Sequence, residues 1–345
     1  MDSQLTAVEK IIIPHDAFER GRILLNQLYK YASGESDAEG IAILGESGTG
    51  KTTLLKQFIA DHELERKADG VEGHVLYASV PSTPTVGGLA GVMLQALGAE
   101  DWHRGTQIQK TQRLTKLIDE VGILVIVIDE FNHFIERKSG NVQMYQTADW
   151  LKKLIDDTGR NLVVSGLPSC RAVIDQNQQL KRRFSAPIEL PRFSWTDKEQ
   201  RKQFKIVLKA FYKEVAKEYS TPEYFSGEMA FRFYCASGGL IGYVHKLLKQ
   251  ALRNASDVES KSIEIRDLHK AFLQALWDAT QATDLPLPFD KGFTPTESVD
   301  LLERVARIGQ RIELPQERKP RRGKKEQGVP GPTDPSPNPQ AESKA

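Results

Sequence analysis

Two short stretches of this 345-residue sequence place residues at a spacing suited to phosphate chemistry. The first is Ile41–Thr53, IAILGESGTGKTT, which contains the pattern G-x-x-x-x-G-K-[ST] of a Walker A P-loop. Its glycines let successive backbone N–H groups turn toward an anion, and the helix that follows adds its positive N-terminal end. We therefore expect a nucleoside triphosphate site. The residues expected to contact the nucleotide are Gly45, Glu46, Ser47, Gly48, Thr49, Gly50, Lys51, Thr52 and Thr53.

The second stretch is the apolar run Ile123–Phe131, ILVIVIDEF, which ends in two adjacent acids. A carboxylate pair at the end of a buried strand is costly unless it has a function. A Walker B motif supplies one, because Asp129 would hold Mg²⁺ together with Thr52, and Glu130 would polarise the attacking water. Lys51 would reach the β- and γ-phosphates. The pair of motifs predicts an ATPase that uses ATP and Mg²⁺.

Composition excludes several other classes of protein. Hydrophobic residues make up 39% of the chain and charged residues 27%, which is typical of a globular protein. The formal net charge of +1 means that any nucleic-acid binding must come from local patches. Cys170 and Cys235 form no C-x-x-C pair, and the N-terminus has no apolar signal region. We therefore expect a soluble intracellular protein with no membrane-spanning segment.

Hydrophobic periodicity divides the chain into four parts. It predicts an N-terminal extension over 1–40, an α/β core with a central parallel sheet over 41–194, a small α-helical lid over 195–282, and a C-terminal extension over 283–345. We expect the extension to be disordered from about residue 315, because residues 315–345 contain 7 of the 17 prolines and a cluster of basic residues.

The predicted elements of the core follow the same periodicity. The expected strands are at 41–44, 73–80, 123–131, 161–165 and 186–190. Helices are expected from residue 16 and over 54–62, 85–97, 106–120, 145–158 and 171–180, with a polar loop over 132–142. The lid helices are expected at about 197–218, 222–236, 240–255 and 264–281.

The order of these motifs resembles that of AAA+ ATPases, and more specifically that of the TniB/TnsC family of transposition regulators. The resemblance covers roughly residues 10–280. The matching segments are Gly45–Thr53, Leu76–Pro81 with Thr83-Pro84-Thr85, Ile126–Phe131, Arg183-Phe184 and Gly239–Gly242. One departure is Tyr243, where relatives often carry a nucleotide-sensing arginine; Lys246 is one turn later.

The resemblance assigns further roles in hydrolysis. Ser165 stands where such ATPases carry a polar sensor of the γ-phosphate, although it could equally be an ordinary serine in a turn. Arg182 and Arg183 precede the last strand, where AAA+ proteins present an arginine finger to a neighbouring subunit, with Arg183 slightly favoured. Segments like Ile13–His15 often cover the adenine ring, with ordinary core packing as the alternative.

The resemblance also implies partners. ATP-bound subunits of this family form a homo-oligomer, as a ring or helical filament, on duplex DNA without reading its sequence, and recruit a transposase. A target-selecting protein, in some relatives an RNA-guided complex, nucleates the assembly. The implied DNA contacts are Thr83, Arg104, Thr106 and Lys110, and the implied location is the bacterial cytoplasm, on the nucleoid. A loader ATPase acting on a replication protein, and a signalling NTPase without DNA, are the alternatives.

Overall fold

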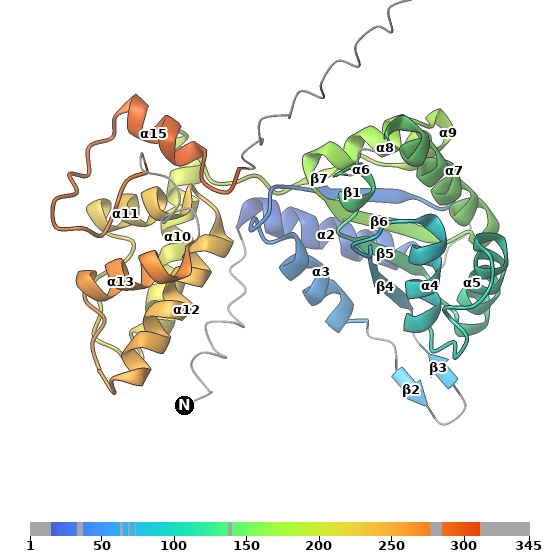
Figure 1. The fold of residues 1–345 in the computed structure, drawn as a ribbon, viewed down its shortest axis with the longest axis horizontal. Helices are drawn as coiled ribbons and strands as arrows, with labels where there is room; N and C mark the ends of the chain where they lie inside the picture. The colour runs from blue at the N-terminus through green and yellow to red at the C-terminus, as the bar shows by residue number, and fades with distance from the viewer. Residues whose placement is uncertain are drawn as a thin grey trace, which may run out of the picture. The chain divides into compact units, whose positions relative to one another are not determined.

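The computed structural model describes residues 15–32, 37–62, 65–67, 70–72, 74–136, 140–276 and 285–310 (Figure 1). Ile13, and the part of the chain from residue 315 that was expected to be disordered, lie outside the described residues.

Five parallel strands form the central sheet, in the order β4-β5-β6-β1-β7. The strands are β1 (Gly40–Leu44), β4 (Val75–Ser79), β5 (Val125–Asp129), β6 (Asn161–Gly166) and β7 (Ile188–Glu189). Because all five run in the same direction, their carboxyl ends meet at one edge of the sheet, where α/β proteins place their ligands. The predicted parallel sheet and each of its five strands are confirmed.

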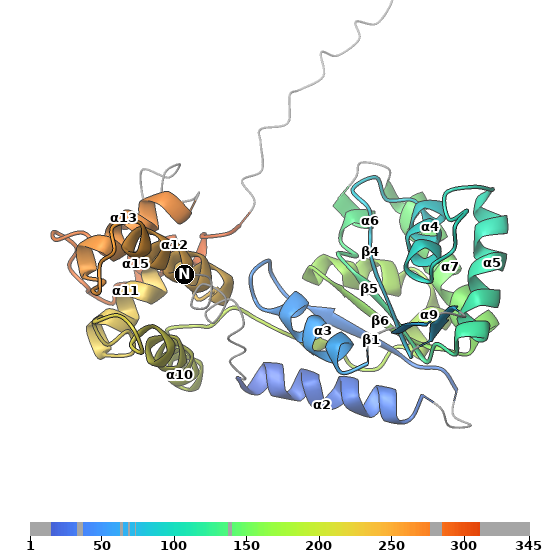
Figure 2. The same ribbon diagram turned by 90° about the horizontal axis from the view of Figure 1, so that it is seen from below.

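Helices cover both faces of this sheet, and the alternation of side chains along the strands assigns each face. On β1, Ile41 and Ile43 pack with the face covered by α2 and α3, whereas Ala42 and Leu44 pack with the face covered by the other helices. Figure 2 shows α2 and α3 together along one face. The core helices are α2 (Asp16–Lys30), α3 (Lys51–Ala60), α4 (Val86–Ala96), α5 (Gln107–Val121), α6 (His133–Glu136), α7 (Gly140–Thr158), α8 (Arg171–Asp175) and α9 (Gln178–Arg183).

Three local features differ from the prediction. The expected loop over 132–142 instead contains α6 and the start of α7. The expected helix over 171–180 follows a 3₁₀ turn, Pro168–Cys170, and is broken into α8 and α9, because the Asn177 side chain caps α9 by accepting hydrogen bonds from the backbone N–H groups of Gln179 and Leu180. A two-stranded antiparallel hairpin, β2 (Glu65–Lys67) and β3 (Gly70–Glu72), was not predicted.

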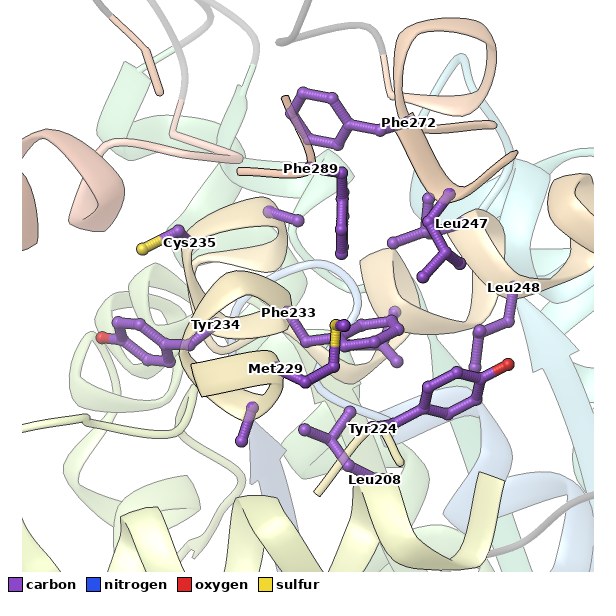
Figure 3. Close-up of a cluster of buried hydrophobic side chains, with 14 of the residues drawn as sticks. Leu208, Tyr224, Met229, Phe233, Tyr234, Cys235, Leu247, Leu248, Phe272 and Phe289 are labelled. Carbon is purple, nitrogen blue, oxygen red and sulfur yellow. The ribbon is translucent and has the colours of Figure 1, made fainter. Parts of the chain in front are cut away.

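The helices between residues 198 and 275 pack around a hydrophobic cluster of their own. They are α10 (Lys198–Val215), α11 (Gly227–Ser237), α12 (Ile241–Asp257) and α13 (Ile265–Ala275). Figure 3 shows part of this cluster, including Tyr224, Phe233 and Leu248, all fully or nearly fully buried. Four helices were predicted in this region, and its described residues form four. Contacts group residues 1–309 as one compact unit, so the division of core from lid at residue 194 stays a prediction.

Residues 285–309, which we call the C-terminal strap, fold onto these helices. Phe289 is 1% exposed and lies between Phe233 and Phe272, at ring-centroid distances of 5.3 and 6.2 Å (Figure 3). Helix α15 (Val299–Ala306) adds Leu301 and Val305 to the same cluster. No helix or strand was predicted in this segment. Among the described residues, no helix has the length and apolar character needed to cross a membrane.

Candidate nucleotide-binding site

The P-loop joins β1 to α3 at the carboxyl edge of the sheet. Its backbone takes the left-handed conformation at Gly48 (φ +84°) and Gly50 (φ +100°), where a side chain would be strained. Gly45 is required for a different reason, since a Cβ atom there would lie 2.4 Å from the Leu190 carbonyl oxygen. These glycines let the loop curl ahead of the N-terminus of α3, which is the arrangement that binds phosphate.

Lys51, the first residue of α3, is held inside this loop. Its ammonium group donates hydrogen bonds to the carbonyl oxygens of Gly45 (2.8 Å) and Glu46 (2.9 Å). Burial lowers the pKa of Lys51, and the carboxylates of Glu130 and Asp129 act in the opposite direction. A desolvated ammonium with acidic neighbours is suited to bind the anionic phosphates of a nucleotide.

Thr52 and Asp129 lie together, as the two motifs predict for the metal site. The Thr52 hydroxyl donates to Asp129 Oδ2 at 3.3 Å, and the Tyr77 hydroxyl approaches the same oxygen at 3.4 Å. Burial and the neighbouring Asp129 raise the pKa of Tyr77 to about 12, so Tyr77 stays a hydrogen-bond donor at neutral pH. Asp129 is only 2% exposed. A hydroxyl and a carboxylate are the hard oxygen donors that Mg²⁺ prefers, so the residues present fit this ion.

Glu130 has a backbone that few non-glycine residues adopt. Its φ is +55°, in the left-handed region, and its N–H donates to the Asp129 side chain at 2.9 Å. The backbone of the next residue is hydrogen-bonded to β6, because the Phe131 N–H donates to the Ser165 carbonyl oxygen at 2.9 Å. Such strain clusters at functional sites. Here it accompanies an exposed carboxylate that lines the same cavity as Lys51.

A cavity of about 280 Å³ extends from the P-loop to the helices of the C-terminal half. Its polar end is formed by residues 47–53 and Glu130. Its other end is formed by His15, Phe18, Phe211, Ile241, Gly242 and His245. Burial lowers the pKa of His15, which keeps its imidazole neutral. An aromatic and apolar end beside a phosphate-binding end is suited to a nucleotide, and His15 belongs to the segment predicted to contact the adenine.

Helix α12 touches the P-loop through its backbone. The Gly242 N–H donates to the Gly48 carbonyl oxygen at 2.8 Å. A Cβ atom at Gly242 would lie 2.9 Å from Gly48 Cα, so only glycine permits this approach without movement of the backbone. The contact connects the helix that follows the Gly239–Gly242 signature directly to the nucleotide-binding loop.

We expect Gly242→Ala to destabilise the protein by about 1–3 kcal/mol, the usual effect of overpacking, and to weaken nucleotide binding. Calorimetry and titration with a fluorescent ATP analogue measure the two effects. Gly227→Ala is the matched control, because a Cβ atom at Gly227 meets nothing within 4 Å. Equal stability and affinity for Gly242→Ala and the control would show that the contact between α12 and the P-loop is unimportant.

Ser165 and Tyr243 do not line this cavity. Ser165 lies at the end of β6, fully buried, and its hydroxyl makes no hydrogen bond within the part of the chain that the structure describes. A buried hydroxyl without a partner, next to the strand that ends in Asp129, calls for an explanation, and the predicted sensor role would supply one. Tyr243 instead faces the strap, since a Cβ atom at Gly309 would lie 3.4 Å from its hydroxyl, and Lys246 lies over its ring.

The two arginines proposed as fingers differ in their surroundings. Arg183 is paired within its own chain, with Asp156 at 3.2 Å and Asp37 at 3.7 Å. Arg182 is exposed at the end of α9 and pairs with no carboxylate among the described residues. Arg183 is therefore engaged by carboxylates of its own chain, whereas the Arg182 side chain extends from α9 without such a pair among the described residues.

The residues predicted to contact DNA come from the loop before α4, from the turn before α5 and from the first turn of α5. Thr83 is exposed in the loop between β4 and α4, and Arg104 is exposed in the turn before α5. The starts of α4 and α5 lie together, since a Cβ atom at Gly87 would be 3.4 Å from Gln107 Cβ. Thr106 caps α5 by accepting from the Gln109 N–H. Lys110 passes beside Gly91 of α4.

One partly buried ion pair beside this site was not predicted. Glu46, in the P-loop, accepts hydrogen bonds from Arg192, whose side chain is 15% exposed. Arg192 lies in the segment between β7 and α10, and an arginine in such a connection belongs to no motif. The one sequence feature that could have indicated this ion pair is a basic residue directly after Pro191, where the chain leaves the sheet.

Comparison with known structures places the fold in a known class. The ORC2 protein of Aeropyrum pernix, in ADPNP–ADP complexes, is 15% identical, with a TM-score of 0.55 over 80% of this chain and 72% of that one. The CDC6P protein of Pyrobaculum aerophilum is 15% identical, with a TM-score of 0.55 over 79% and 71%. The ORC1 protein of A. pernix, in complex with DNA, is 16% identical, with a TM-score of 0.56 over 80% and 70%. No curated protein sequence matches.

These likenesses, together with the sheet and its P-loop, identify the fold as that of a P-loop AAA+ ATPase. A family model described as "Bacterial TniB protein" matches residues 7–195, more than half of the chain. The fold and the family support nucleotide binding and, in general, nucleotide hydrolysis. The matched residues contain the P-loop, the acidic pair that ends β5 and the strands that hold them, and the chain belongs to the bacterial TniB protein family.

Proposed function

We propose that this protein is an ATP-dependent, DNA-binding regulator of DNA transposition. In the ATP state it oligomerises on target duplex DNA as a ring or helical filament and recruits a transposase to a site chosen by a target-selecting protein. Hydrolysis of ATP with Mg²⁺ then disassembles the oligomer. Such a protein would act in the bacterial cytoplasm, on the nucleoid.

One observation supports this proposal most strongly: the groups expected to bind ATP and activate water within one subunit lie at one cavity in a chain of the TniB family. Lys51, Thr52 and Glu130 line that cavity, and the Thr52 hydroxyl donates a hydrogen bond to Asp129. The set would bind ATP in one subunit. A finger from Arg182 of the next subunit would complete it, which makes nucleotide binding and assembly a single event.

The candidate DNA contacts support the same function. The loops that carry Thr83 and Arg104 lie beside one another, at the starts of α4 and α5. Hydroxyl and basic side chains on neighbouring loops suit the phosphate backbone, which positions a protein without reading sequence. This accords with the net charge of +1, because the DNA surface would be local.

Sedimentation with duplex DNA tests the proposal. We expect the protein to pellet with DNA of any sequence when a non-hydrolysable ATP analogue is present, and to remain in the supernatant with ADP. Raising the salt concentration should abolish the assembly. Failure to bind DNA in either nucleotide state would contradict the proposal and favour a loader or a signalling ATPase.

We expect Lys110→Ala to weaken DNA binding severalfold for every sequence. The slope of log K against log salt concentration should become smaller by about one, as it does when one phosphate contact is lost. Fluorescence anisotropy with labelled duplexes at several salt concentrations measures both. Lys116→Ala is the matched control, because Lys116 lies further along α5 and pairs with Glu120 at 3.4 Å. Equal effects of the two variants would exclude a specific contact by Lys110.

A further inference from the structure

Arg192 uses every hydrogen-bond donor of its guanidinium group. Nε and Nη2 donate to the two carboxylate oxygens of Glu46, the first at 2.8 Å. Nη1 donates to the carbonyl oxygens of Ala306 (3.0 Å) and Gly238 (3.3 Å), and Nη2 donates to that of Ile308 (3.0 Å). A guanidinium has five N–H groups, and all five are engaged. Such a complete set fixes both the arginine and the groups around it.

The partners of Arg192 come from three separate parts of the chain. Glu46 belongs to the P-loop, Gly238 to the turn between α11 and α12, and Ala306 and Ile308 to the strap. The segment that carries Arg192 is itself fixed, because the Phe193 N–H donates to the Gly239 carbonyl oxygen at 3.0 Å. Arg192 is therefore the point at which the strap meets the nucleotide-binding loop.

Glu46 is held from two sides. Its carboxylate pairs with Arg192, while its backbone carbonyl accepts a hydrogen bond from the Lys51 ammonium at 2.9 Å. Any shift of Glu46 therefore moves an acceptor of the lysine that is expected to bind the phosphates. The path from the strap to Lys51 passes through two residues, Arg192 and Glu46.

The fit of the strap depends on glycine. Gly238 has a φ of +59°, and a Cβ atom there would lie 2.9 Å from the Val305 carbonyl oxygen. The strap is also tied to α10 by an ion pair between Glu297 and Arg201 at 3.3 Å, which does not involve the P-loop. The Glu297–Arg201 ion pair can therefore be compared with the Arg192 contacts, because it holds the strap without contacting the nucleotide site.

We propose that Arg192 is a positioning residue that couples docking of the strap to nucleotide binding. The docked strap holds Arg192, Arg192 holds Glu46, and the P-loop is kept in the form that binds phosphate. Displacement of the strap lowers nucleotide affinity, and by thermodynamic linkage nucleotide stabilises the docked strap to the same extent. The inference rests on the proposed nucleotide site and adds a regulatory input to it.

Nucleotide titration and hydrogen exchange test the coupling. We expect Arg192→Ala to lower the affinity for a fluorescent ATP analogue about tenfold, within the usual range for coupled sites. In the wild-type protein, nucleotide should slow amide exchange in residues 305–309. In Arg192→Ala that response should disappear. Arg201→Ala, the matched control, should keep both wild-type affinity and the nucleotide response of the strap.

A second variant separates positioning from simple charge effects and guards against misfolding. Glu46→Gln keeps the size of the side chain but removes the charged pair. We therefore expect weaker nucleotide binding and faster amide hydrogen exchange in the strap. If Arg192 acted only by neutralising Glu46, Glu46→Gln would bind nucleotide at least as tightly as the wild type, and the proposal would be overturned. Wild-type affinity for Arg192→Ala, or an unchanged strap response, would also overturn it. Absence of nucleotide binding by the wild-type protein would instead contradict the proposed function.

Discussion

Glu130→Gln should bind ATP with wild-type affinity and hydrolyse it about 10²–10⁴ times more slowly, the range lost when a general base is removed. The carboxylate lines the cavity beside Lys51 and is held there by a left-handed backbone that the substitution does not alter. Glutamine has the same shape but cannot accept a proton from the attacking water. A steady-state phosphate-release assay, together with a binding titration, measures the two quantities.

A carboxylate at the same edge of the sheet provides the control for Glu130. Glu189 ends β7 and pairs with Arg171 at 3.0 Å, outside the cavity. Glu189→Gln should therefore hydrolyse ATP at the wild-type rate. If Glu130→Gln also retained the wild-type rate, the Walker B assignment of this residue would be wrong. A large loss of affinity would instead assign Glu130 to nucleotide binding rather than to hydrolysis.

The second large effect is expected at the subunit interface. Arg182→Ala should lower hydrolysis by the assembled protein about 10³-fold, the lower range for loss of an arginine finger, without reducing ATP binding by single subunits. Arg182 is exposed on α9, whereas its neighbour Arg183 is paired with Asp156. Arg183→Ala is thus the matched control, and it should cost some stability but little hydrolysis.

Mixing subunits tests whether this arginine acts in trans. Arg182→Ala subunits mixed with Glu130→Gln subunits should regain part of the activity, because one of the mixed interfaces contains both wild-type residues. No recovery in any ratio would exclude a shared site. If Arg183→Ala rather than Arg182→Ala lost hydrolysis, Arg183 would be the finger, as the resemblance slightly favoured.

Much of the fold was predictable because its elements depend on local pattern. The run Ile123–Ile128 is apolar at every position, as a strand buried on both faces requires, and β5 begins within it at Val125 and ends at Asp129. The P-loop was predictable because its glycines and lysine stand at fixed offsets. Likewise, the contact of Thr52 with Asp129 follows from two motifs that meet at one sheet edge.

The strap and Arg192 were not predictable, because both depend on contacts between distant segments. Phe289 follows a proline-containing stretch without periodicity, yet it fills a gap between Phe233 and Phe272. Arg192 binds a residue 146 positions earlier and another 116 positions later, and neither partner is marked by spacing. A glycine after a helix is expected to take a positive φ, as Gly238 does, but nothing in the sequence indicates that the strap packs against it.

In the function that we propose, the nucleotide held by the P-loop decides whether the protein stays on DNA. The most direct measurement is the rate at which assemblies formed with ATP leave a labelled duplex, followed by anisotropy while phosphate release is recorded in the same sample. We predict that wild-type protein leaves at the rate of hydrolysis, and that Glu130→Gln stays bound about 10² times longer or more. Equal departure rates for the two proteins would contradict the claim.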